Sequence, residues 1–74
     1  MADHLGWLAE HLGILRWFER EGQPHLRVAV PTGENSAAVA IVAVEDVAYA
    51  LALAVEQVRT EVDALTRRSR LALV

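Results

Sequence analysis

Apolar residues recur at helical spacing in the first part of the chain. Leu5, Leu8 and Leu12 follow one another at intervals of three and four residues, the spacing of one face of an α-helix. Leu15 continues this spacing three residues after Leu12. Three more apolar residues widen the face: Trp7, Ile14 and Phe18. Gly22 and Pro24 then form a stop signal. The pattern predicts one helix that begins near residue 4 and ends at this stop signal.

Two short apolar runs follow, separated by turn-forming residues. Leu26, Val28 and Val30 alternate with Arg27 and Ala29, which is typical of a strand with one face covered. The second run, residues 37–44, is apolar on both faces: Val39, Ile41 and Ala43 on one, and Ala40, Val42 and Val44 on the other. That pattern indicates a strand covered on both sides.

The segment between these runs, residues 31–36, reads PTGENS. Its turn formers predict a hairpin loop. Pro31 belongs at the end of the first strand, because proline cannot donate to a ladder.

A second, longer helix is predicted after the acidic pair Glu45 and Asp46. Asp46 is placed to cap it, and the helix should span about residues 47–69. Its apolar stripe is continuous: Val47, Leu51, Val55, Val58, Val62 and Leu65. Tyr49 and Leu53 lie opposite this stripe, so we expect the first half of the helix to be buried and the second half to reach solvent. The apolar tail from Leu71 to Val74 is either a frayed end or a small extra strand.

These elements predict a single α+β domain over residues 1–74, in the order helix–strand–strand–helix. The fold is an antiparallel hairpin packed by two helices. A two-stranded sheet is marginal by itself, and the second strand needs cover on both faces. We therefore expect the sheet to be completed by dimerisation, because a symmetric dimer is the commonest closed assembly.

Composition supports the expectation of a partner. The 74-residue chain is 54% apolar, has no cysteine and carries a net charge of −3; its mean hydropathy is +0.26. A chain this short is marginally stable unless a disulfide, a metal or oligomerisation assists it. The expected interface residues are Trp7, Trp17, Ala40, Val42, Val44, Tyr49 and Leu53. Trp17 falls on the polar side of the first predicted helix, where it is either an interface anchor or a cover for the sheet edge of its own chain.

The most apolar stretch, residues 36–55, is interrupted by Glu45 and Asp46. Each charge costs roughly 2.5–3.5 kcal/mol at the centre of a membrane helix, so no membrane span is expected. The N-terminal residues also lack the basic and apolar regions of a signal peptide. We expect a cytoplasmic protein.

Candidate chemical groups are few, and each has a structural explanation. His4 and His11 lie seven residues apart, about 10.5 Å along a helix, which is too far for both to bind one zinc ion within a single chain. They could meet only across a dimer axis. His25, beside Pro24, is interpreted as a loop residue. Glu45 and Asp46 are interpreted as helix-capping residues rather than as an acid–base pair.

Phosphate and nucleic acid are not favoured as ligands either. The loop at residues 31–36 has one glycine, no lysine and no following helix, unlike a phosphate-binding loop. Arg67, Arg68 and Arg70 form the only basic cluster along the sequence, and Glu61 and Asp63 lie on the same helix. A solvated helix end explains this cluster without nucleic acid.

The expected function is a small non-enzymatic interaction module, that is, a dimeric adaptor, chaperone-like or regulatory protein that acts through apolar helix and strand surfaces. Its partner would be a second copy or a related chain, with no cofactor, no metal and no catalytic residue. One alternative is a small dimeric enzyme or ligand-binding protein with a pocket at the interface. Another is a nucleic-acid-binding regulator that uses the C-terminal arginines.

Overall fold

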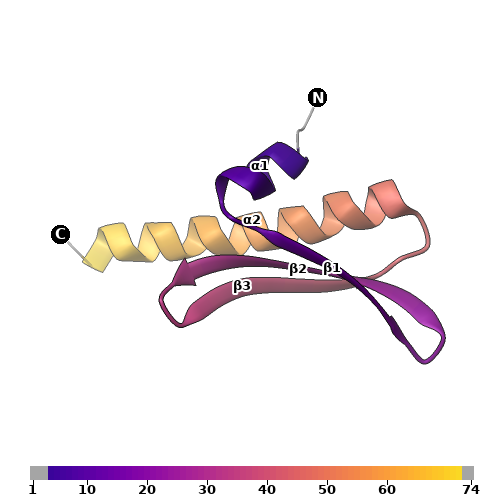
Figure 1. The fold of residues 1–74 in the computed structure, drawn as a ribbon. Helices are drawn as coiled ribbons and strands as arrows, with labels where there is room; N and C mark the ends of the chain where they lie inside the picture. Colours follow the sequence, from indigo (N-terminus) through magenta and orange to yellow (C-terminus); the bar gives the residue numbers. More distant parts are fainter. Residues whose placement is uncertain (1–3, 73–74) are drawn as a thin grey trace.

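The computed structural model describes residues 4–72, with side chains as far as residue 68 (Figure 1). The elements are α1 (His4–Glu10), β1 (Ile14–Arg20), β2 (Gln23–Gly33), β3 (Ser36–Ala43) and α2 (Val47–Ala72). The strands form one antiparallel sheet in the order β1-β2-β3. The predicted α+β class is confirmed, but the predicted helix–strand–strand–helix order is wrong, because a third strand lies between α1 and the predicted hairpin.

The helix predicted from residue 4 to the Gly22–Pro24 stop signal ends at Glu10 instead. Leu12 has a positive φ of 59°, a backbone conformation that no α-helix contains. At Gly13 a Cβ atom would lie only 2.5 Å from Leu8 Cδ2, so the chain turns tightly against α1. Gly13 is therefore packed against this chain's own α1. Leu12 and Leu15 keep the helical spacing of the leucines, although Leu12 lies between α1 and β1 and Leu15 lies in β1.

The stop signal belongs to a β-turn between β1 and β2. Arg20 pairs with Gln23, which leaves a two-residue loop of Glu21 and Gly22 with φ values of 52° and 77°. Positive φ at both positions is the geometry of a type I′ turn, whose twist suits a hairpin. Pro24 and His25 follow inside β2 rather than in a loop.

The second hairpin was predicted correctly, with a shorter loop. Gly33 pairs with Ser36, so the strands continue into the segment expected to be loop. The ladder is irregular between Pro31 and Gly33, close to the proline that cannot donate. The Thr32 and Ser36 hydroxyls are hydrogen-bonded to each other at 2.9 Å across this end.

Asp46 caps α2 as predicted. Its Oδ1 accepts a hydrogen bond from the backbone N–H of Tyr49 at 3.0 Å, and its carbonyl accepts the N–H of Ala50 at 2.9 Å. The helix continues beyond the predicted end at residue 69 to Ala72. Residues 71–72 of the apolar tail are thus helical, and residues 73–74 lie outside the described part of the chain.

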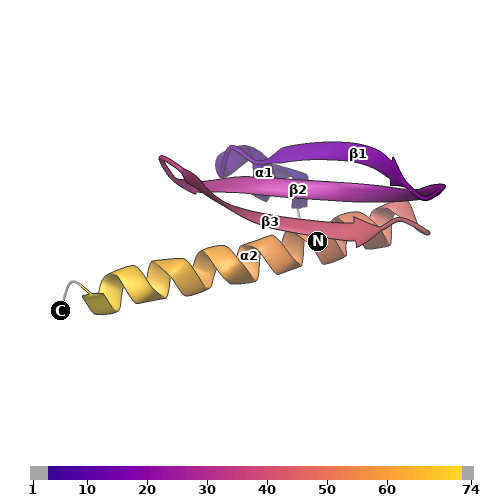
Figure 2. The ribbon, with the colours of Figure 1, turned by 90° about the horizontal axis from the view of Figure 1, so that it is seen from below.

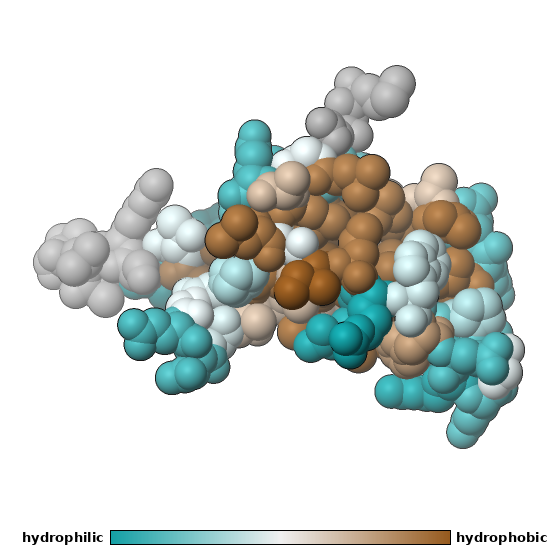
Figure 3. All heavy atoms as spheres, in the orientation of Figure 1, coloured by the Kyte–Doolittle hydropathy of each residue, from teal (hydrophilic) through white to brown (hydrophobic). Residues whose placement is uncertain are grey.

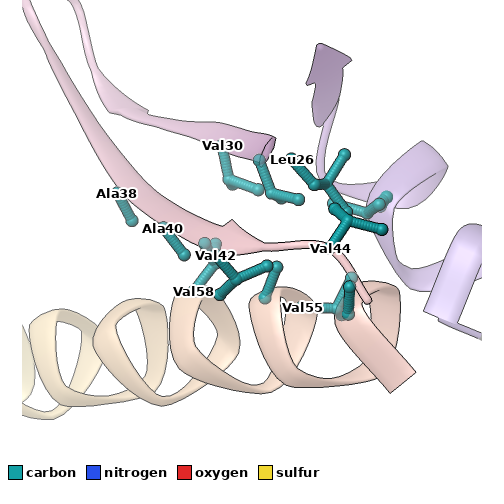
Figure 4. Packing of buried hydrophobic residues seen from close by; sticks show 12 residues of the cluster. Leu26, Val30, Ala38, Ala40, Val42, Val44, Val55 and Val58 are labelled. Atoms are coloured by element: carbon teal, nitrogen blue, oxygen red, sulfur yellow. The ribbon is translucent and has the colours of Figure 1, made fainter. Parts of the chain in front are cut away.

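One side of the sheet packs against both helices (Figure 2). Leu8 of α1, alternate residues of β2 and β3, and one side of α2 form a single buried cluster. Figure 4 shows Val42 of β3 beside Val58 of α2, and Val44 above Val55. Ala50 and Ala54 are also buried in α2, and these small side chains let the helix approach β3 closely. The predicted stripe is buried at Val55 and Val58, whereas Val47 at its start is exposed.

The other face of the sheet is covered by neither α1 nor α2. Val39 and Ile41 are exposed there, so β3 is covered on one face only. The prediction that β3 is covered on both faces is therefore wrong.

The third strand removes one of the two reasons for expecting a dimer. A three-stranded sheet with a packed face has the minimum needed for independent stability, so the marginal hairpin is no longer a reason for association. Exposed apolar surface is the remaining reason.

Candidate functional site

Three of the expected interface residues lie inside the chain's own core. Ala40, Val42 and Val44 are buried beside α2, so their side chains offer no surface to a partner. Trp7 is half-buried and packs against the same cluster.

The other three expected interface residues are exposed. Tyr49 and Leu53 lie on α2, with 68% and 38% of their surface accessible. Trp17 lies on β1, not on a helix, and is 52% exposed. Both alternatives for Trp17 assumed a helix, whereas the residue is part of the edge strand β1; its role as an interface anchor stays a prediction. Whether Tyr49 and Leu53 meet a partner stays a prediction.

The β1 strand is the most exposed apolar element, because no residue of Ile14–Arg20 is buried. It forms one edge of the sheet, opposite β3 (Figure 2). The α2 helix packs against β3 and β2, and α1 has only seven residues. Neither helix therefore encloses Leu15 and Trp17, which pair with core positions of β2 and face the helices.

Both faces of β1 present apolar side chains to solvent. Register places Ile14 opposite Ala29 and Phe18 opposite His25 on the helix-free face, because paired residues share a face. Ile14 is 62% exposed. Figure 3 shows apolar surface gathered where α1 and β1 lie in the same view in Figure 1. Large exposed apolar residues in this part of the chain are Leu5, Leu12, Ile14, Leu15 and Trp17.

This edge could have been found from the sequence, but only in part. Residues 14–18 read ILRWF, an apolar run with aromatic residues of high strand propensity. The same residues continued the leucine spacing of α1, and the helical interpretation prevailed. Which edge of the sheet they occupy follows only from the strand order.

The histidines are engaged within the chain. His4 Nε2 lies 3.6 Å from Glu56 Oε1 of α2. His11 follows α1, its ring is stacked on Trp7, and its Nδ1 donates a hydrogen bond to the Trp7 carbonyl at 2.8 Å. His25 likewise donates from Nδ1 to the Gln23 carbonyl at 2.8 Å. No group of three or more potential metal ligands occurs within residues 4–72.

The carboxylates at the start of α2 are exposed, and Asp46 is committed to the helix cap. An open cleft lies between the end of β2 and the second half of α2, lined by His11, Val30, Pro31, Thr32, Val62, Leu65 and Thr66. The hydroxyls of Thr32 and Thr66 bond to Ser36 and to the Val62 carbonyl. Polar and apolar side chains line the cleft, and both of its threonine hydroxyls are already hydrogen-bonded.

The C-terminal arginines lie along α2 rather than in a site. Arg67 and Arg68 are exposed, and the side chain of Arg70 lies outside the described part. Within the described residues, no helix is both long enough and apolar enough to cross a membrane.

No protein-family model, curated protein or solved structure matches this chain.

Proposed function

We propose that this chain is a non-enzymatic protein-interaction module that forms a homodimer through the free edge of β1. The observation that supports this is the exposure of β1: an edge strand without one buried residue, apolar on both faces. An unpaired apolar edge is a template for another strand. Pairing two copies of β1 about a two-fold axis would join two three-stranded sheets into one of six strands.

Charge and strand length together select one register for this pairing. A two-fold axis perpendicular to the sheet keeps each face continuous, so a residue can lie opposite only residues of its own face. With the axis at Arg16, the two copies of Arg16 lie opposite each other. With the axis at Phe18, Arg16 lies opposite Arg20 of the second copy. With the axis at Trp17, Arg16 lies opposite Phe18, a cation–π arrangement without opposed arginines. We place the axis at Trp17, because like charges directly opposite are destabilising. Trp17 is also the middle residue of Ile14–Arg20, so this axis pairs the whole strand with its copy.

Disulfide trapping tests this register, since the chain has no native cysteine. In the Trp17→Cys variant the two thiols meet at the axis, within the reach of a disulfide. In the Leu15→Cys variant, on the same face, the two Cα atoms are about 14 Å apart along the strands at 3.4 Å per residue, beyond the ~7 Å limit. We expect a covalent dimer for the first variant and none for the second. Crosslinking of Arg16→Cys instead would place the axis at Arg16 and refute the register.

Sedimentation of the unmodified chain at micromolar concentration tests association itself. A folded monomer would refute the dimer. Trp17→Lys should dissociate it by placing two ammonium groups at the axis, whereas Tyr49→Lys, at an exposed aromatic residue of α2, should not. The opposite pair of results would move the interface to the outer side of α2.

A further inference from the structure

The helix-free face of the sheet has a composition that differs from the rest of the surface. Three cross-strand rows cover it from β1 to β3: Ile14, Ala29 and Val39; Arg16, Arg27 and Ile41; and Phe18, His25 and Ala43. Apolar rows thus flank a row that contains two arginines. Val39 and Ile41 are 39% and 45% exposed, so this face combines exposed apolar surface with positive charge.

Among the residues that the structure describes, no ion pair neutralises the positive charge on this face. Arg16 and Arg27 are direct cross-strand partners, and neither makes an ion pair in the described part of the chain. No acidic residue occupies the three rows, although the whole chain has ten acidic and seven basic residues. Glu19 of β1 falls on the opposite face by strand alternation. The face is therefore locally basic on an acidic protein.

We propose that this face binds an acidic amphipathic helix of a partner protein. A sheet face has no free backbone groups, since the ladder bonds lie in the plane of the sheet. A segment that docks there must satisfy its own backbone, and a helix does so. Carboxylates of that helix bind Arg16 and Arg27, and its apolar stripe covers Ile14, Val39 and Ile41. The result is a sheet with helices on both faces.

A second copy of the same face fits this surface poorly. Face-to-face packing of two copies would remove four arginines from water without a carboxylate among the three rows. Burial of unpaired charge costs several kcal/mol per ion. The site proposed for the acidic helix is distinct from the dimer interface proposed above. A helix bound there covers a face of the sheet and leaves the β1 edge free.

Nucleic acid also fits less well than an acidic helix. Single strands bind to aromatic side chains on which bases can stack. The aromatic residue in these rows, Phe18, is stacked with His25 at 5.3 Å, and the Arg20 guanidinium lies 5.7 Å from its ring centre. The remaining exposed side chains near the arginines are aliphatic, which suits the leucines of a helix.

Fluorescence anisotropy with designed peptides tests the proposal on the full chain. The probe is a labelled 21-residue amphipathic helix with leucine on one stripe and glutamate on the other positions. One control peptide has lysine in place of every glutamate, and another has serine in place of every leucine. We expect the first peptide to bind at least tenfold more tightly than either control, with affinity that falls as salt rises.

Variants then locate the site. Arg16→Glu should weaken peptide binding at least tenfold, and this change also turns a repulsive cross-strand pair into an attractive one, so the fold is retained. Arg27→Gln should weaken binding similarly. Arg67→Glu, on the exposed part of α2, should leave it unchanged. Circular dichroism and sedimentation of each variant separate loss of binding from loss of fold or of the dimer.

Three outcomes would overturn the proposal: equal binding of the acidic and basic peptides, full retention of binding in both arginine variants, or tighter binding to a competitor. The competitors are a labelled 20-nucleotide single-stranded RNA and vesicles of phosphatidylcholine with phosphatidylglycerol. Preference for the RNA would assign the face to nucleic acid, and preference for the vesicles to an anionic lipid surface. A monomeric protein that still binds the acidic peptide would refute the dimer and leave this proposal intact.

Discussion

Arg16 of β1 lies directly opposite Arg27 of β2 on the sheet face that neither helix covers. Two like charges at paired positions oppose strand association, and no carboxylate of the described chain neutralises them. The sheet tolerates this pair because its stability comes from the other face, where Leu26 and Val28 are fully buried. The acidic helix proposed above would supply the negative charge that this pair lacks.

Relief of this repulsion should stabilise the free protein. We expect Arg16→Thr to raise the free energy of unfolding by about 0.2–1 kcal/mol, measured by urea denaturation at low salt. The gain should shrink at high salt, since ions screen the two guanidinium groups. Glu19→Thr is the matched control, on the same strand but on the other face and without a like-charged partner. A loss of stability in Arg16→Thr, or a gain that salt does not change, would show that repulsion is not significant.

The capping role of Asp46 predicts a selective loss of stability. Asp46→Ala removes the acceptor of the Tyr49 N–H and should lower the free energy of unfolding by about 1 kcal/mol. Asp46→Asn keeps an acceptor oxygen and should lower it by less. Glu45→Ala, at the adjacent exposed carboxylate, should have a smaller effect than Asp46→Ala. Equal losses at both positions would indicate a general charge effect on α2 instead of a cap.

Two leucines that differ in burial allow a test of the core. Leu26 is fully buried, whereas Leu12 is 74% exposed. Leu26→Ala should destabilise the protein by about 2–5 kcal/mol, the range for a buried leucine. Leu12→Ala should change stability by no more than about 0.5 kcal/mol. Thermal unfolding followed by circular dichroism checks both, and a similar cost at the two positions would contradict the packing of β2 against the helices.

The turn between β1 and β2 offers a stabilising substitution. Glu21 has φ of 52°, a conformation that costs most L-residues roughly 1–2 kcal/mol. Asparagine tolerates it better, and Asn-Gly is the preferred type I′ pair. Glu21→Asn should therefore raise the melting temperature, and Gly22→Ala should lower it because Gly22 also has positive φ. A rise for Gly22→Ala would contradict this turn geometry.

Much of the fold was predictable where local patterns and tertiary packing agree. The hairpin of β2 and β3, the cap at Asp46 and the long α2 were all found from alternation, helical spacing and capping chemistry. Each of these signals is local, since it depends on residues within a few positions of one another. The metal and acid–base alternatives were set aside on similar local grounds, from the spacing of His4 and His11 and the adjacency of Glu45 and Asp46.

The region around β1 could not be predicted in the same way. Leu12 and Leu15 continued the spacing of α1, while residues 14–18 also suited a strand, and local propensity does not decide between two compatible patterns. Pairing with β2 decides it, because a strand at this position places Leu15 and Trp17 beside Val28 and Leu26. That pairing depends on residues about ten positions away, outside the window of a helical or strand pattern.

By itself, the amino-acid sequence determined which segments are apolar, where α2 begins, and that one surface of β2 belongs in a core. Tertiary structure alone decided which strand lies at the edge and which sheet face stays open. The apolar residues on both faces of β3 indicated cover on both sides, yet α2 is one helix and covers only one of them. Arg16 and Arg27 are eleven residues apart in sequence and become neighbours only through the register of the β1–β2 ladder. The candidate interaction surfaces arise from such long-range neighbours, because both are made of side chains that the sheet brings together and the helices do not cover.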